Sequence, residues 1–342
     1  MATARRRGGG RRPRRLGLLW QLLGLLGLGL LATVLWSRRR GFSLAELEED
    51  FAPPPGPPVE PPAEAEAERP EDSASDVADI AVWIAGPAGN LLVRDGGPAP
   101  EEVAGLPVLF VHSLGGNGGQ WALQLDHLRR TRRAVALDLR GHGGSDPADD
   151  GDYSIEAFAA DVAAVADELA LRRFVLVGHS LGGSVAIEYA GRHPERVAGL
   201  LLVDPNGDQS GVPKTQAESF VRAIAADPHA EMEWHFRQIL AHGEPSASRW
   251  VLEDLHKTDE AALVGAIESS FRYQPLPALA RFGGPKLTVV SDMNSLPYSL
   301  HKLVPGLRMR LVAGTGHWLQ MDRPGVVNSL LDELIAEAEA AR

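Results

Sequence analysis

The stretch that decides the fold is Phe-Val-Leu-Val-Gly-His-Ser-Leu-Gly-Gly, residues 174–183. It starts as a continuous apolar run, which is typical of a strand buried on both faces, and it continues into a helical pattern at 181–192. A Gly-x-Ser-x-Gly segment between a strand and a helix forms a nucleophile elbow, a tight turn that exposes the serine hydroxyl. The pattern predicts that Ser180 is a nucleophile, although the same five residues also fit an ordinary turn in a glycine-rich chain.

Apolar runs and helical patterns alternate on both sides of this segment. The predicted strands are an opening hairpin at 82–84 and 90–93 and central strands at 108–111, 134–137, 174–177, 200–203, 287–290 and 308–312. The predicted helices include 154–169, 181–192 and 324–340. Alternation of this kind predicts an α/β fold in which helices cover both faces of a mostly parallel sheet. Residues 81–342 suffice for one such domain.

The interval 206–284 interrupts this alternation. It contains helical patterns such as 217–226, 230–240 and 260–271 and no convincing strand. An insertion between two strands of the sheet is where a lid over an active site is placed, so we expect a helical lid at about 206–284. Four apolar residues of its middle part are predicted to pack on the core rather than to face lipid: Trp234, Phe236, Ile239 and Leu240.

Polar, glycine-rich loops follow three other predicted strands. They lie at 112–116, at 138–146 and at 313–318, and the last of them carries His317. The carboxyl ends of parallel strands meet at one edge of a sheet, so a serine at one strand end and a histidine at another are expected to lie close together. This placement predicts that Ser180 and His317 belong to one site.

Four motifs carry a family resemblance when they are taken together. They are Gly-His-Ser-Leu-Gly-Gly at 178–183, Asp-Leu-Arg-Gly-His-Gly-Gly-Ser-Asp at 138–146, the histidine-containing loop at 112–116, and Gly-Thr-Gly-His-Trp at 314–318 followed by Met-Asp-Arg-Pro at 321–324. At these residues the chain resembles the α/β-hydrolase fold family. The resemblance covers roughly residues 81–342 and implies a serine hydrolase that acts on a carboxylic ester or related acyl substrate.

The resemblance also implies roles for individual residues. It makes Ser180 the nucleophile, His317 the general base and the backbone N–H groups of Leu114 and Leu181 the oxyanion hole. Ser113 departs from the family pattern, because glycine usually stands there. The geometry of the oxyanion hole is therefore in question at this position. A serine at the elbow argues against dehalogenase and epoxide-hydrolase chemistry, which in this family needs a carboxylate nucleophile.

The catalytic acid has more than one candidate. In the usual arrangement of the family it follows the strand at 287–290 by several residues, where this chain has Asn294, with Asp292 two residues early. Some members, haloalkane dehalogenases among them, carry the acid one strand earlier, and that position matches Asp204. We favour Asp204, with Asp292 as the alternative acid and Asp208 as a third candidate.

The remaining motif histidines are predicted to be structural. His142 is expected to brace the turn at 138–146 by hydrogen bonds. His179 is expected to lie beside the nucleophile without reacting, and His193 to end a helix. No His or Asp/Glu pair has the spacing of a zinc motif, and no glycine loop carries the Lys-Ser/Thr of a phosphate cradle, so no metal and no nucleotide cofactor is expected. The chain has no cysteine, which excludes disulfides, thiolate metal sites and a cysteine nucleophile.

The N-terminal part is predicted to determine location. Residues 16–36 carry no charge and as a helix would span about 30 Å, the thickness of the hydrocarbon core. Seven Arg precede this transmembrane helix and three follow it, which places the basic residues 1–15 in the cytoplasm and the rest of the chain outside. The alternative is a cleaved signal peptide and a secreted domain. It is less favoured because the apolar run is long and lacks a small-x-small cleavage site.

Charge and composition change again after this segment. Residues 37–80 are rich in Pro, Glu and Ala and are predicted to form a disordered stalk. Ten of the 34 basic residues lie in 1–40, where no acid occurs, so 41–342 carries 24 basic against 45 acidic side chains. This acidic excess argues against nucleic-acid binding by the main domain.

Two alternatives to an esterase remain open. The same three side chains fit perhydrolysis, as in the cofactor-free haloperoxidases that the sequence also resembles, or hydrolysis of a C–C bond. From a different class, the fold could serve as a non-catalytic binding module, and the irregular position of the acid is the feature that supports this reading.

Overall fold

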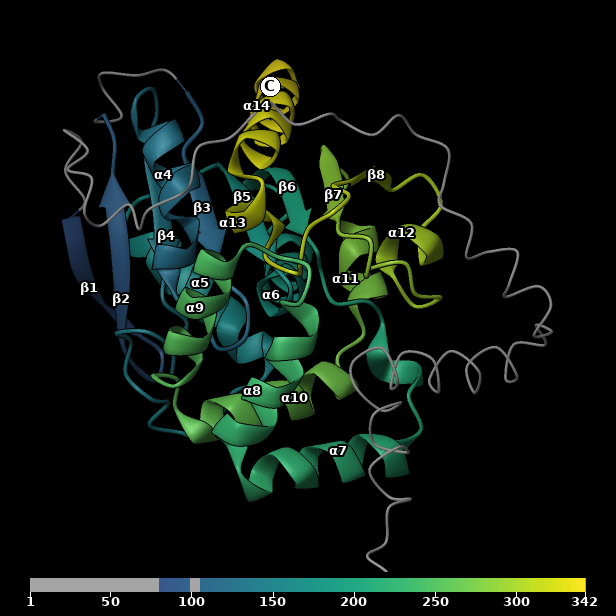
Figure 1. The fold of residues 1–342 in the computed structure, drawn as a ribbon. Helices are drawn as coiled ribbons and strands as arrows, with labels where there is room; N and C mark the ends of the chain where they lie inside the picture. The colour runs from purple at the N-terminus through teal and green to yellow at the C-terminus, as the bar shows by residue number, and fades with distance from the viewer. Residues whose placement is uncertain (1–79, 99–104, 342) are drawn as a thin grey trace, which may run out of the picture.

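The computed structural model describes residues 80–98 and 105–341, and its centre is an eight-stranded sheet (Figure 1). The strand order is β1-β2-β4-β3-β5-β6-β7-β8. The strands are β1 Ile80–Gly86, β2 Gly89–Gly96, β3 Val108–Val111, β4 Ala134–Leu137, β5 Phe174–His179, β6 Val197–Val203, β7 Lys286–Val290 and β8 Arg308–Leu311. The six strands from β4 to β8 in this order are parallel, whereas β1 and β2 pair antiparallel at one edge. The predicted α/β fold with a mostly parallel sheet is confirmed.

Helices cover both faces of the sheet. They are α4 Ala122–Arg129, α5 Ile155–Glu168, α6 Leu181–Arg192, α7 Lys214–Ala226, α8 Pro228–Ile239, α9 Pro245–Leu255, α10 Glu260–Arg272, α11 Pro275–Arg281, α12 Leu300–Leu303, α13 Leu319–Asp322 and α14 Pro324–Ala340, with 3-10 turns at Gly118–Trp121 and Gln209–Gly211. Strand β3 shows why both layers form: Leu109 and Val111 pack with α5 and α6, and Val108 and Phe110 pack with α4 and α14. A strand buried on both faces needs a continuous apolar run, as the sequence analysis assumed.

The segment between β6 and β7 is helical throughout its regular elements, as predicted. Helices α7, α8 and α10 lie together beyond one end of the sheet (Figure 1). Within the predicted interval 206–284, α11 packs against α6. A Cβ atom at Gly191 would lie 2.6 Å from the carbonyl oxygen of Ala278, so the two helices touch through their backbones. We call α7 to α10 the helical insertion; its function as a lid stays a prediction.

The predicted N-terminal regions lie outside the described residues. This applies to the basic segment 1–15, the transmembrane helix 16–36 and the stalk 37–80 up to residue 79; Ile80 already belongs to β1. Within the described part of the chain, no helix is both long enough and apolar enough to span a membrane.

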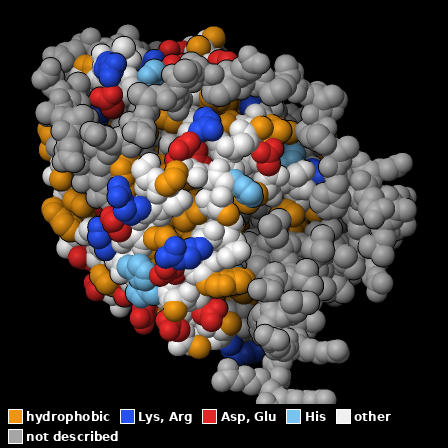
Figure 2. Space-filling view, in the orientation of Figure 1, with side chains coloured by type: hydrophobic (Ala, Val, Ile, Leu, Met, Phe, Trp, Pro, Cys, Tyr) orange, Lys and Arg blue, Asp and Glu red, His pale blue; other side chains and the backbone are white. Residues whose placement is uncertain are grey.

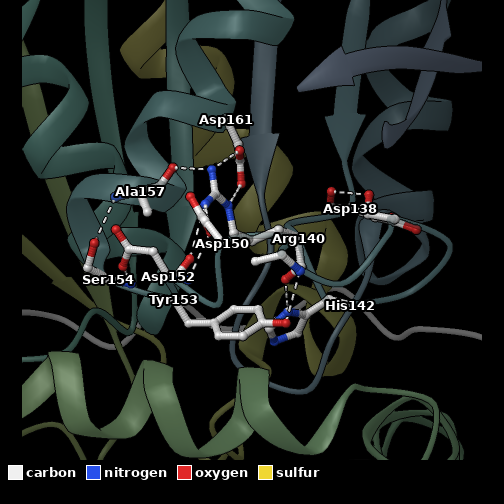
Figure 3. A network of polar contacts seen from close by, with 11 residues as sticks. Asp138, Arg140, His142, Asp150, Asp152, Tyr153, Ser154, Ala157 and Asp161 are labelled. Atoms are coloured by element: carbon white, nitrogen blue, oxygen red, sulfur yellow. Dashed lines mark hydrogen bonds and ion pairs between the residues drawn. The ribbon is translucent and has the colours of Figure 1, made fainter. Parts of the chain in front are cut away.

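The turn after β4 is fixed by a buried ion pair (Figure 3). The Arg140 guanidinium donates to both carboxylate oxygens of Asp161 at 2.7 and 2.6 Å and also to the carbonyl oxygen of Ala157. His142 Nδ1 lies 3.0 Å from the carbonyl oxygen of Arg140, and burial together with the neighbouring His112 lowers the pKa of His142 to about 3. A neutral histidine that bonds to its own turn fits the predicted bracing role.

The surface carries charges of both signs. Figure 2 shows acidic, basic and apolar side chains side by side over the described part of one face. Several of the charges form ion pairs one helical turn apart, among them Arg237 with Glu233 and Arg272 with Glu268.

Candidate active site

Ser180 lies in a strained turn between β5 and α6. Its backbone angles are φ 53° and ψ −113°, a region that non-glycine residues occupy mainly where the surrounding structure enforces it. A Cβ atom at Gly178 would lie 2.2 Å from the carbonyl oxygen of Gly182, and one at Gly182 would lie 2.4 Å from that of His112. Both glycines are therefore required by close backbone contacts, and the turn has the geometry of a nucleophile elbow.

His317 is bound to Asp204. The His317 Nδ1 atom lies 2.6 Å from Asp204 Oδ2, and both residues lie at the end of the sheet that holds Ser180. Asp204 is itself fixed: its carboxylate accepts hydrogen bonds from the backbone N–H and the hydroxyl of Ser291, each at 2.9 Å. Since Nδ1 carries the proton donated to the carboxylate, Nε2 of His317 is left as a proton acceptor.

The other candidate acids have different partners. Asp292 accepts a hydrogen bond from the backbone N–H of Gly314 at 2.8 Å, and Asp208 accepts from the N–H and hydroxyl of Ser210. The structure thus brings Asp204, and neither of these two, to His317.

The Ser180 hydroxyl has a neighbour that the sequence analysis did not identify. Its Oγ lies 3.4 Å from Asn206 Oδ1, and both residues line the cavity that His317 also lines. Asn206 follows the acid by two residues and no motif marks it. The chain bends between β6 and Asn206, where Asp204 has φ 40°.

Two backbone N–H groups are available beside Ser180. Leu181 is the first residue of α6 and Leu114 lies in the loop after β3, and within the described residues neither N–H has a hydrogen-bond acceptor. Both residues line the same cavity. The Ser113 carbonyl is held by His112, whose Nδ1 lies 2.7 Å from it. The loop accommodates a serine at this position, and the Ser113 hydroxyl donates a hydrogen bond to the Leu114 carbonyl oxygen at 3.3 Å.

His179 supports the histidine loop. Its Nε2 lies 2.9 Å from the carbonyl oxygen of His317, and its Nδ1 lies 3.3 Å from Gln320 Nε2. Burial and the neighbouring His317 lower the pKa of His179 well below its usual range. As a neutral ring it donates with one nitrogen and accepts with the other.

Two buried polar side chains join the histidine loop to the helical insertion. The Asp322 carboxylate accepts from the N–H of Gly316 and from that of Glu244, each at 2.8 Å. Gln120 accepts from the indole N–H of Trp318 and donates to Asp254, each at 3.1 Å. Glu244 and Asp254 lie at the two ends of α9, so this helix is held at both ends to residues beside His317. Asp322 lies in the motif at 321–324 and Gln120 lies in none of the motifs, and no role was predicted for either residue.

A cavity of about 190 Å³ lies between the sheet end and the insertion. Its lining is mostly apolar, and the insertion contributes Phe220, Met232, Phe236, Ile239, Ile267 and Phe271. Phe236 and Leu240 are buried in the core and Ile239 packs against it, as predicted. The prediction is wrong for Trp234, which is 40% exposed. In the described ranges 80–98 and 105–341, no group of three or more His, Asp or Glu side chains is placed to hold a metal ion.

The sequence of this chain matches the model of a known protein family. A family model described as the alpha/beta hydrolase fold matches residues 107–324. The dihydrolipoyllysine-residue acetyltransferase component of the acetoin cleaving system of Cupriavidus necator is 32% identical over 236 residues, covering 66% of this chain and 62% of that protein. This chain thus spans less than two thirds of that relative's length.

Two further similarities extend over most of the length of the similar protein. The 2-hydroxymuconate semialdehyde hydrolase of Pseudomonas sp. is 27% identical over 269 residues, covering 70% of this chain and 90% of that protein. The structure of a thermophilic esterase from Thermogutta terrifontis superposes with a TM-score of 0.64 at 22% identity, covering 76% of this chain and 99% of the esterase. The second similarity is evidence for the fold alone.

Proposed function

Because this chain belongs to the α/β-hydrolase fold family of hydrolytic enzymes, we propose that it is a serine hydrolase that cleaves a carboxylic ester through an acyl-enzyme on Ser180. One observation carries the proposal. The Asp204 carboxylate lies 2.6 Å from His317 Nδ1, beside a serine in a nucleophile elbow and two backbone N–H groups without acceptors. Nucleophile, base, acid and oxyanion donors are the parts that acyl transfer needs.

In the first half of the reaction, His317 Nε2 takes the proton of the Ser180 hydroxyl as its oxygen attacks the ester carbonyl carbon. The N–H groups of Leu114 and Leu181 donate to the carbonyl oxygen as it becomes negative. Asp204 stabilises the imidazolium that forms and keeps the ring in the orientation that the reaction needs. His317 then gives its proton to the leaving alcohol oxygen as the ester C–O bond breaks, which leaves the acyl group on Ser180.

In the second half, water replaces the alcohol. His317 takes a proton from the water as its oxygen attacks the acyl carbon, and it returns that proton to the Ser180 oxygen as the acyl bond breaks. The carboxylic acid is released and the hydroxyl of Ser180 is regenerated. The contact between Asp204 and His317 argues against a non-catalytic binding module, whose support in the sequence was the irregular position of the acid.

Hydrolysis of a carbonyl compound other than an ester is a second candidate. One relative is named as a 2-hydroxymuconate semialdehyde hydrolase, and the substrate in that name contains no ester bond. Its hydrolysis has to break a C–C bond, so C–C bond hydrolysis is the alternative reaction on the same residues. Perhydrolysis, in which hydrogen peroxide replaces water in the second half, would use them as well. Parallel assays with esters, with a C–C substrate of the semialdehyde type and with peroxide plus a carboxylic acid separate the three reactions.

Membrane attachment is part of the proposal. The uncharged residues 16–36, with arginines on both sides, support a single helix that holds the enzyme outside the cytoplasm. We expect the full-length protein to stay in the membrane pellet after alkaline carbonate extraction and to keep its N-terminal residues. A soluble protein that begins after residue 36 would instead establish signal cleavage and secretion.

Mass spectrometry of the acylated enzyme tests the ester reaction. The full-length protein is mixed with a p-nitrophenyl ester and quenched during the first turnover. We expect a burst of nitrophenol and an acyl group on the tryptic peptide that contains Ser180, both absent in Ser180→Ala. Steady ester cleavage without an acylated Ser180 would contradict the proposal.

A further inference from the structure

His235 is a buried histidine in the wall of the cavity that Ser180 lines. It belongs to α8 of the helical insertion, and its side chain is only 5% exposed. Its ring contacts two aromatic rings, Phe220 and Trp234, each with a centroid distance of 4.9 Å. A polar ring in such surroundings calls for a hydrogen-bond partner, because a buried polar group without one is costly.

Within the described residues, His235 Nδ1 has no hydrogen-bond partner. Two buried histidines elsewhere in the fold, His112 and His179, have both ring nitrogens bonded. His142 and His301 also leave one nitrogen without a partner, but neither of them lines the cavity. Nδ1 itself is enclosed by protein atoms. Nε2 of His235 also has no hydrogen-bond partner within the described residues and stays accessible, so it is the ring nitrogen that a molecule in the cavity can reach.

The charge state of the cavity restricts what can enter it. Its ionisable lining residues in the described part of the chain are Asp204, His235, Tyr298 and His317, and Asp204 is bound to His317. Burial lowers the pKa of His235 to about 4 and raises that of Tyr298 to about 12, so both are neutral at pH 7. An anionic group in this cavity would lose water without gaining an opposite charge, and a cationic group would find only the Asp204 carboxylate, which is already bonded to Ser291 and His317.

The volume of the cavity indicates the size of the group that it can hold. Its volume is about 190 Å³, and an engineered apolar cavity of about 150 Å³ in another protein holds one benzene molecule. A group of about six carbon atoms fills a space of this size.

We propose that His235 determines specificity by hydrogen-bonding a neutral polar group of the substrate, so that the preferred substrate is an uncharged ester with a small apolar part that carries a carbonyl or hydroxyl oxygen. This inference rests on the proposed function. In its neutral form the ring has one donor and one acceptor nitrogen, so it can donate to a carbonyl oxygen or accept from a hydroxyl. His235 is not assigned a part in bond making or breaking.

Matched esters test the proposal on the full-length protein. One series compares p-nitrophenyl hexanoate with p-nitrophenyl 5-oxohexanoate, and a second compares butyl acetate with 3-oxobutyl acetate. We expect the oxo ester of one series to have a kcat/KM about 3- to 10-fold higher than its plain partner, the effect of one neutral hydrogen bond. Absence of this preference in both series would overturn the proposal.

Variants assign the preference to the residue. His235→Leu is expected to abolish it by slowing the oxo ester while the plain ester keeps its rate. His235→Gln, which keeps a donor and an acceptor, should retain part of the preference and serves if the leucine variant does not fold. Gln238→Leu, at an exposed position of the same helix that does not line the cavity, is the control and should keep the preference in full. A preference that survives His235→Leu would contradict the assignment.

A binding measurement separates this proposal from the proposed function. The full-length protein with ¹⁵N-labelled histidine is titrated with 2,5-hexanedione, a neutral diketone of six carbons, and the spectrum of His235→Gln assigns the signal. We expect the imidazole signal of His235 to shift even if no ester is cleaved. Ester cleavage without a shift and without an oxo preference would leave the proposed function standing and overturn the role of His235.

Discussion

The end of the sheet and the helical insertion form the two walls of one cavity, but they are built differently. On the sheet side, Ser180 and Asp204 have positive φ angles, and the side chain of Asp204 is fixed by short hydrogen bonds. On the insertion side, amphipathic helices present aromatic and aliphatic side chains, and His235 has a ring nitrogen without a partner. In the proposed reaction, the reacting groups are therefore held by the ends of their own strands, whereas the apolar wall that would meet the substrate is formed by the packing of the insertion.

Replacing the acid has the largest expected effect. In Asp204→Asn the carboxylate that orients His317 is lost, and we expect kcat for an activated ester to fall by about 10³- to 10⁴-fold. Asp292→Asn is the matched control at the other candidate position, and it should change kcat by less than about 3-fold, because Asp292 bonds to Gly314 and not to His317. Equal losses in both variants would break the distinction between these two aspartates.

Replacing Asp322, which joins the histidine loop to the helical insertion, has the next largest expected effect. In Asp322→Asn one of the N–H groups of Gly316 and Glu244 faces an amide NH₂ instead of a carboxylate oxygen. A lost hydrogen bond in a buried place costs about 1–3 kcal/mol, so we expect kcat to fall by about 5- to 150-fold. Asp332→Asn, a partly exposed aspartate paired with His127, should leave kcat unchanged.

Kinetics of Asp322→Asn also show which wall depends on the link. We expect the loss to fall on kcat and on the rate of serine acylation, with KM nearly constant, because Gly316 precedes His317. A change in KM alone would mean that the link serves the insertion and not the histidine loop.

The stability of the protein is expected to depend on pH through two buried histidines on the sheet side. Burial lowers the pKa of His112 to about 4 and that of His142 to about 3, whereas an unfolded histidine has a pKa of about 6.5. Below pH 6.5 the unfolded chain therefore binds protons that the folded chain does not. The free energy of unfolding should be highest above that pH and should fall by about 1.4 kcal/mol per pH unit and histidine as the pH drops toward 4.

Urea denaturation at pH 7, 6 and 5 measures this slope. Burial raises the pKa values of Asp138 and Asp322, which acts in the opposite direction, so the difference between the parent and His142→Gln isolates the histidine. We expect a shallower slope in the variant. A parent protein whose stability does not depend on pH between 7 and 5 would contradict the neutral, buried state of these rings.

The smallest change in kcat is expected from replacing Ser113 in the loop at 112–116. Ser113→Gly restores the residue that is usual in the family, and the donor at the next position is a backbone N–H. We expect kcat to stay within about 3-fold of the parent, because surface and loop changes that leave a donor in place are small. A large gain would mean that the Ser113 hydroxyl, which lies 3.3 Å from the Leu114 carbonyl, holds the loop away from its best geometry.

The elements that sequence reasoning predicted best are those with sharp local signals. The bounds of β3, β4, α6 and α14 agree with the prediction at every residue. The two strands are short apolar runs, whereas α6 begins directly after the elbow serine and α14 begins at a proline. Helices α9 and α11 were not among the predicted ones. The signal for α9 was present: proline at its first position and Ala247, Val251 and Leu255 on one buried face, but most of its other residues are polar.

The site was predictable to the extent that motifs mark it. Ser180, His317, Leu114 and Leu181 follow strands in recognisable patterns, and the structure brings them to one cavity. The choice between Asp204 and Asp292 depends on where a side chain points after a strand, and spacing does not contain that information. Residues with no motif were missed because their partners come from distant segments, as with Gln120 and Trp318, which are 198 positions apart.

Labelling of the serine with a fluorophosphonate probe tests the central claim most directly. The full-length parent is treated beside Ser180→Ala, Asp204→Asn and Asp292→Asn, and the labelling rate and stoichiometry are read by mass spectrometry. The account predicts one label per parent chain, no label in Ser180→Ala, labelling slowed by about 10³-fold or more in Asp204→Asn, and a nearly normal rate in Asp292→Asn. A folded parent that takes up no label, or a label that persists in Ser180→Ala, would contradict it.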